Sequence, residues 1–123
     1  MYDLALAVEI LNQIKFATEL IIIRFKPIKS VDDLVSTTYG MEKLDSICMQ
    51  LIVIGESLKN LDKVTNKELL PKYPKMEWKK IMGLRDIITH HYVDINADAI
   101  FDICENKVYP LSNYISKIII DLS

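Results

Sequence analysis

Arg85, Asp86, His90 and Tyr92 lie within eight positions of one another in the second half of the chain. An arginine guanidinium is a permanent cation whose planar donors suit phosphate oxygens, and a histidine imidazole exchanges protons near neutral pH. Both histidines of the chain, His90 and His91, are in this segment, and we treat His91 as a neighbour rather than a participant. Together these side chains predict cleavage of a phosphodiester bond without a cofactor.

RNA is the phosphodiester that such a set suits best, because it carries its own nucleophile, the 2′-hydroxyl. Cleavage then needs a positioned proton acceptor or donor, typically worth about 10²–10⁴-fold in rate, and a cation at the crowded phosphate. One histidine cannot act as acid and base in the same step. A two-fold pairing that brings two copies of His90 together would supply both groups.

The spacing of Arg85 and His90 limits how they can meet. Residues five apart on an ideal helix are rotated by about 140° and separated by about 7.5 Å. The two side chains therefore converge only if the helix frays or ends near Thr89, or if two subunits contribute to one cleft. Asp86, four residues before His90, shares its helical face and could hold an imidazole N–H. Tyr92 and His90 would lie on one side of an extended segment.

Several other interpretations stay open at this point. Arg85 could satisfy carbonyls at a helix C-terminus, with His90 as a capping residue. Glu56 follows a strongly apolar run and is either an exposed helix acid or a partner for a cation such as Arg85. No HxxxH or HExxH pattern is present, so no metal site is predicted.

Basic residues concentrate just before Arg85. The chain has a net charge of −2. The segment from position 72 to 85 contains five basic residues and one acidic residue, Glu77, so its charge is +4 and the rest of the chain carries −6. Such asymmetry would attract a polyanion to one region, and Lys75, Lys79 and Lys80 are the candidate RNA-binding residues. A solvated helix face is the alternative interpretation.

Apolar residues recur at three- and four-residue steps along most of the chain, which predicts helices. We expect helices over residues 2–24, 31–36 (capped by Ser30), 41–61 and 76–89, a helical turn at 66–70, and a loop at 91–95. Asn96 should cap a last helix that Pro110 kinks or restarts, and Tyr39-Gly40 should mark a break. Gly55, in mid-helix, predicts close approach of another helix backbone.

These elements predict an all-α, antiparallel bundle of four to five helices, formed by residues 1–123 as one domain. The apolar runs 21–25 and 118–120 exceed what a small bundle covers, which favours a homodimer. No run approaches the about 20 residues that span a bilayer, and the start of the chain does not resemble a signal peptide. Cys48 and Cys104, set among apolar neighbours, are expected to be buried free thiols in a reducing cytoplasm.

Arg85-x4-His90-x-Tyr92 matches the Arg-x4-His-x-Tyr motif of the HepT-like toxins, a family within the HEPN superfamily of helical ribonuclease domains. Two further segments resemble that family: the apolar-Ile-Gly-Glu sequence at 51–57, and Tyr73-Pro74 followed by the Trp…Ile-x-Gly-x-Arg-Asp sequence at 78–86. The triplet alone would be weak. Three segments in order and at suitable spacing make the resemblance specific.

The resemblance implies a dimeric, metal-independent ribonuclease that is the toxin of a bacterial or archaeal toxin–antitoxin pair. Arg85 and His90 would be catalytic, while Asp86 and Glu56 match polar positions of the family and are candidate supporting residues. Tyr92 matches the tyrosine that the family's partner, a minimal nucleotidyltransferase antitoxin of the MntA type, modifies with AMP. The alternative is a non-catalytic HEPN module that dimerises and regulates such a nucleotidyltransferase.

Overall fold

The computed structural model describes residues 2–90 and 96–123, and within them every regular element is helical. The elements are α1 (Leu4–Phe25), α2 (Asp32–Val35), α3 (Thr38–Val64), a 3₁₀ turn (Leu70–Lys72), α4 (Trp78–Met82), α5 (Leu84–His90), α6 (Ala97–Asn106) and α7 (Val108–Leu122). The predicted all-α bundle is therefore confirmed.

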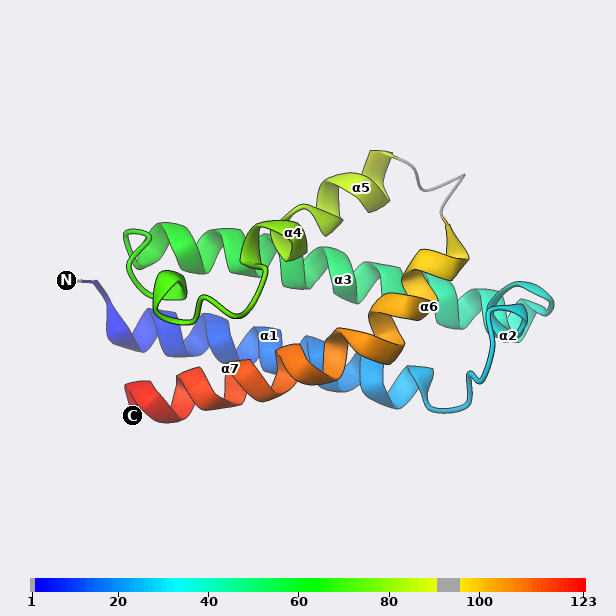
Figure 1. Cartoon of the computed structure of the whole chain (residues 1–123), viewed down its shortest axis with the longest axis horizontal. Helices are drawn as coiled ribbons and strands as arrows, with labels where there is room; N and C mark the ends of the chain where they lie inside the picture. The colour runs from blue at the N-terminus through cyan, green and yellow to red at the C-terminus, as the bar shows by residue number, and fades with distance from the viewer. Residues whose placement is uncertain (1, 91–95) are drawn as a thin grey trace.

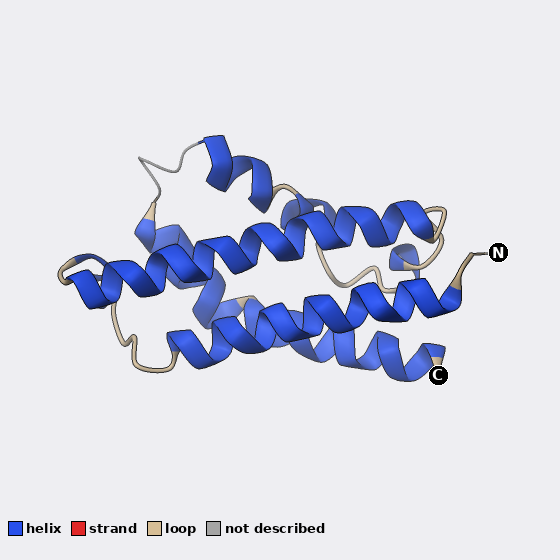
Figure 2. Ribbon diagram, turned by 180° about the vertical axis from the view of Figure 1, so that it is seen from behind, coloured by secondary structure: helices blue, strands red, loops and turns tan. Residues whose placement is uncertain are grey.

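Three long helices form the body of the bundle. α3 runs antiparallel to α1, and α7 runs antiparallel to α1 on its other side, so that both ends of the chain lie at one end of the molecule (Figure 1). α4 and α5 lie across the side of α3 that faces away from α1, as both views show (Figures 1 and 2). The segment that carries the predicted chemistry thus lies on the outside of α3.

The core is almost entirely aliphatic, as the three- and four-residue spacing requires. Fully buried side chains include Leu11, Ile14, Ile47, Ile54 and Ile115, drawn from α1, α3 and α7. The same spacing continues into α5 through the buried Ile88, which packs into this core. Because Ile88 is buried, the polar residues on the other faces of α5 are directed toward solvent.

A small polar cluster joins α1 to α7 within this core. The Lys15 ammonium donates to the Ser112 hydroxyl at 2.9 Å, and the Thr18 hydroxyl lies 3.0 Å from the same oxygen. Buried polar groups are tolerated when they are hydrogen-bonded in this way. The cluster fixes the register of the two helices.

The first predicted boundaries need three corrections. α1 begins at Leu4 because the Asp3 carboxylate caps it by accepting the Leu6 amide at 3.0 Å. Ser30 does not cap the next helix; instead the Asp33 carboxylate accepts the amides of residues 29 and 30. The break expected at Tyr39-Gly40 is absent, since α3 begins at Thr38. A Cβ at Gly40 would overlap the Asp33 carbonyl oxygen, so this glycine permits close packing.

The predicted helix over residues 76–89 is two helices. α4 ends at Met82 and is followed by Gly83, whose amide donates back to the Lys79 carbonyl at 3.0 Å, and α5 begins at Leu84. The expected turn at 66–70 is also wrong: Asn66 and Lys67 have positive φ angles of 56° and 61°, and the 3₁₀ turn follows at Leu70–Lys72.

The last predicted helix is divided at Lys107 into α6 and α7. The Asn96 side chain caps α6 by accepting the Ala99 amide at 3.2 Å, as predicted. Pro110 occupies the third position of α7, where its missing amide hydrogen breaks no helical bond, so the restart interpretation holds.

The two apolar runs at 21–25 and 118–120 are partly buried and partly exposed. Ile21 and Ile118 are completely buried, whereas Ile23 and Ile120 are 64% and 70% exposed.

Cys48 and Cys104 are buried free thiols, as predicted. Burial raises the pKa of Cys48 to about 11 and that of Cys104 to about 12, so neither is a ready nucleophile. In the part of the chain that is described, no helix is long and apolar enough to cross a membrane.

Candidate active site

Gly55 allows α4 and α5 to approach α3 closely. A Cβ added at Gly55 would lie 3.2 Å from the carbonyl oxygens of Ile81 and Met82 and 3.4 Å from the Cβ of Arg85. The predicted close approach of a helix backbone is therefore confirmed. The close approach places the Cβ of Arg85 against α3 at Gly55, the residue before Glu56.

Arg85 is held between two carboxylates. Its Nε lies 3.8 Å from Oε2 of Glu56, and its Nη1 donates to Oδ1 of Asp86 at 3.1 Å. Lys59 approaches the other oxygen of Asp86, with Nζ 3.6 Å from Oδ2. The Arg85 hydrogen bond, followed by the nearby charge of Lys59, holds the pKa of the Asp86 carboxyl below its usual range. Glu56 is thus an exposed helix acid that also lies beside Arg85, so the two predicted interpretations are not exclusive, and the carboxylate is not buried.

His90 is exposed at the end of α5, with Nδ1 2.9 Å from the backbone carbonyl oxygen of Asp86. Because a carbonyl oxygen only accepts hydrogen bonds, this contact requires the proton on Nδ1. The neutral ring then has its lone pair on Nε2, where it can accept a proton. The expected contact of His90 with Asp86 exists, but through the backbone carbonyl rather than the carboxylate.

Arg85 and His90 lie on the same helix. Because α5 includes both residues, it does not end before His90, which was one of the two conditions for their convergence, and the two positions are rotated by about 140° from one another. The Thr89 hydroxyl donates to the Arg85 carbonyl at 2.8 Å and supports this last turn. Tyr92 and His91, with the predicted loop at 91–95, lie outside the described residues.

The predicted basic residues lie beside this site rather than in it. Lys75, Lys79 and Lys80 are exposed on α4 and the turn before it, and Lys80 pairs with Glu77 at 2.8 Å. Among residues 2–90 and 96–123, no group of three His, Cys, Asp or Glu side chains is arranged to hold a metal ion.

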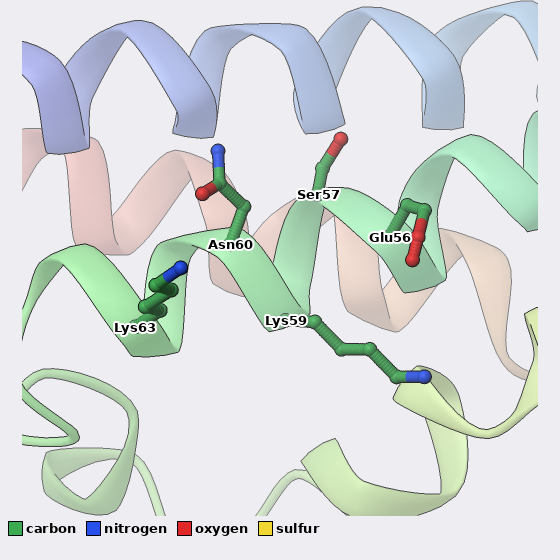
Figure 3. Close-up of a pocket in the computed structure, with 5 residues that line it drawn as sticks. All are labelled: Glu56, Ser57, Lys59, Asn60 and Lys63. Carbon is green, nitrogen blue, oxygen red and sulfur yellow. The ribbon is translucent and has the colours of Figure 1, made fainter.

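An open groove of about 400 Å³ runs along α3 next to the Arg85 cluster, lined by Glu56, Ser57, Lys59, Asn60 and Lys63. Figure 3 shows Lys59 reaching toward α4 and α5, whereas Ser57 and Asn60 point away from these two helices. The sequence interpretation missed Lys59 and its neighbours. Their positions three, four and seven residues after Glu56 are the helical spacing that could have revealed this common face.

The family model for HepT-like ribonucleases ("Ribonuclease HepT-like") matches residues 10–118, which includes every element from α1 to α7 at least in part. "Putative RNase MJ0127" of Methanocaldococcus jannaschii is 40% identical over 77 residues, which are 63% of this chain and 60% of that protein. "Putative RNase TTE0752" of Caldanaerobacter subterraneus subsp. tengcongensis is 33% identical over 69 residues, 56% of this chain and 58% of that protein.

A third relative, "Putative RNase MJ1216" of M. jannaschii, is 26% identical over 101 residues, 75% of this chain and 80% of that protein. The chain thus spans about three fifths of the length of the first two relatives. No solved structure matches the chain. Because the family model covers most of the sequence, the chain belongs to the HepT-like ribonuclease family.

Proposed function

We propose that this protein is a metal-independent endoribonuclease in which Arg85 binds the scissile phosphate and His90 transfers a proton. The observation that carries the proposal is the arrangement on α5. Two carboxylates lie beside the Arg85 guanidinium, and the Asp86 carbonyl contacts Nδ1 of the exposed His90 imidazole, which leaves Nε2 without that contact. Membership of the HepT-like ribonuclease family supports the same assignment.

The reaction uses the nucleophile that RNA carries. The 2′-oxygen attacks phosphorus and gives its proton to an imidazole, while the bond from phosphorus to the 5′-oxygen breaks and that oxygen receives a proton. Arg85 stabilises the charge that develops on the phosphate. Because the positions of Arg85 and His90 on α5 are rotated by about 140° from one another, we infer that two copies form a homodimer whose sites complete one another.

We further propose that the nuclease is the toxin of a toxin–antitoxin pair, inactivated when a cognate nucleotidyltransferase transfers AMP to Tyr92. Tyr92 is two residues beyond His90, which is about 6.6 Å of extended chain. An added nucleotide would bring phosphate charge and bulk to the place where the substrate phosphate must bind.

Cleavage of RNA by the purified protein in excess chelator tests the proposal. We expect Arg85→Ala and His90→Ala to remove cleavage while circular dichroism stays helical, because both side chains are exposed or half-exposed and outside the core. Cleavage by both variants at the wild-type rate would show another site or a contaminant.

A second candidate function is a non-catalytic module that binds and regulates a nucleotidyltransferase. The separation of Arg85 and His90 on α5 favours it, because the two positions are rotated by about 140° from one another. Absence of RNA cleavage by a dimeric wild-type protein, together with tight binding to the partner, would support this alternative.

A further inference from the structure

Two cations from different helices converge on one carboxylate at this site. Arg85 reaches Oδ1 of Asp86 at 3.1 Å from α5, and Lys59 reaches Oδ2 at 3.6 Å from α3. A phosphate group carries more oxygen acceptors than a carboxylate and can engage both cations at once. The place between Lys59 and Arg85 is therefore suited to a substrate phosphate.

The groove continues from this place along α3. Lys63 is one helical turn beyond Lys59, a rise of about 6 Å, which is comparable with the spacing of neighbouring phosphates along one nucleic-acid strand. Asn60 lies beside it, and Lys63 is exposed and forms no ion pair with a residue of the described part of the chain (Figure 3). Lys63 therefore presents a cation and Asn60 an amide donor that a second phosphate could use.

We propose that this face of α3, the α3 track, binds the backbone of single-stranded RNA beside the scissile bond. Lys59 shares the scissile phosphate with Arg85, and Lys63 with Asn60 holds the adjacent phosphate. A single strand is the occupant because Lys59 and Lys63 follow one another on one helix, one turn apart, and Lys59 belongs to the Arg85 cluster. The inference rests on the proposed ribonuclease function and adds where the strand lies.

Short substrates distinguish the two proposed phosphate positions of the α3 track, the scissile phosphate at Lys59 and the adjacent phosphate at Lys63. A dinucleotide has one internal phosphate, and adding one nucleotide at its 5′ or 3′ end adds a neighbouring phosphate on one side. We expect Lys59→Gln to raise KM for all three substrates by roughly three- to tenfold. Lys63→Gln should leave the dinucleotide unchanged and remove the KM advantage of one extended substrate only.

Lys117→Gln is the matched control, because Lys117 is an exposed lysine on α7 that, like Lys59, forms an ion pair, with Asp121 at 3.7 Å. It should change KM for none of the substrates. Lys59→Arg keeps the charge and should restore most of the loss, whereas a purely structural role of the Lys59 side chain would not be rescued in this way.

Binding of a 2′-O-methylated RNA strand, which cannot be cleaved, tests the track independently of catalysis. The slope of log Kd against log salt should fall by about 0.7 for each lysine that contacts a phosphate, and stay unchanged in Lys117→Gln. Equal affinity and slope in Lys59→Gln, Lys63→Gln and the control would overturn the α3 track, even if the wild type cleaves RNA. Wild type that binds through these lysines but never cleaves would instead contradict the proposed function.

Discussion

Arg85 is the residue on which the charges of the candidate site converge. Glu56 and Asp86 neutralise it, and Lys59 in turn neutralises Asp86, so the four-residue cluster has no net charge. A phosphate must therefore compete with carboxylates for the guanidinium, which favours a strongly charged ligand over a neutral one. The sequence predicted that Glu56 could pair with a cation, and helical spacing places Lys59 on the same face, but the contact between Lys59 and Asp86 depends on where α5 crosses α3.

Tyr92→Phe tests the proposed regulation at the level of one atom. The variant keeps the aromatic ring and removes the phenolic oxygen that would accept AMP, so it should retain RNA cleavage and escape inactivation by the cognate nucleotidyltransferase. Mass spectrometry after incubation with the partner and ATP measures the adduct. An undiminished adduct on the Tyr92→Phe protein would show that another residue is modified.

At the scale of the elements, Gly55 couples the packing of α4 and α5 to the position of Arg85. A leucine side chain at this position would meet the backbone of α4 and must push the helix outward, at a cost of about 1–3 kcal/mol in the free energy of unfolding. We expect Gly55→Leu to reduce RNA cleavage at temperatures where circular dichroism shows that the protein is still folded, because Arg85 moves with α5.

Gly83→Ala is the matched control for this prediction. Gly83 has a right-handed φ of −73°, and a Cβ there would make only ordinary contacts, at 3.5 Å from the carbonyls of Lys79 and Lys80. The change in unfolding free energy should stay below about 1 kcal/mol with activity retained. If Gly83→Ala lost as much activity as Gly55→Leu, the close approach at Gly55 would not be the cause.

Helical periodicity predicted the long helices well and their interruptions poorly. The stripes of α1 and α3 follow from apolar spacing alone, whereas spacing did not show the division at Gly83 into α4 and α5, both of which approach Gly55. The break expected at Gly40 is absent, since that glycine serves packing against Asp33. Gly40 was interpreted from its local propensity to break a helix, whereas a tertiary contact decides its role.

At the scale of the whole molecule, the proposed dimer needs an exposed apolar surface near the site. Ile87 on α5 is 58% exposed, two residues from Arg85 and three from His90, whereas Ile120 on α7 is 70% exposed and belongs to a helix on the opposite side of α1 from α3 and α5 (Figure 1). An exposed apolar side chain beside the proposed catalytic groups is suited to an interface.

Light scattering distinguishes these two surfaces. The wild type should have twice the 14.2 kDa mass of one chain. Ile87→Glu should yield monomers and lose RNA cleavage with them, because charge at the centre of an interface is strongly unfavourable. Ile120→Glu should remain dimeric and active. Dimers that dissociate only in the Ile120→Glu protein would place the interface on α7 and away from the site.

The most direct measurement is the initial rate at which the purified protein cleaves a single-stranded RNA in excess chelator. This rate is compared with that of His90→Ala and with that on the same strand carrying 2′-deoxy sugars. We predict cleavage by the wild type, a rate at least about 10²-fold lower for His90→Ala, and no cleavage of the deoxy strand, because proton transfer by His90 and the 2′-hydroxyl are both required. Equal rates for wild type and His90→Ala, or cleavage of the deoxy strand as fast as of RNA, would contradict the assignment.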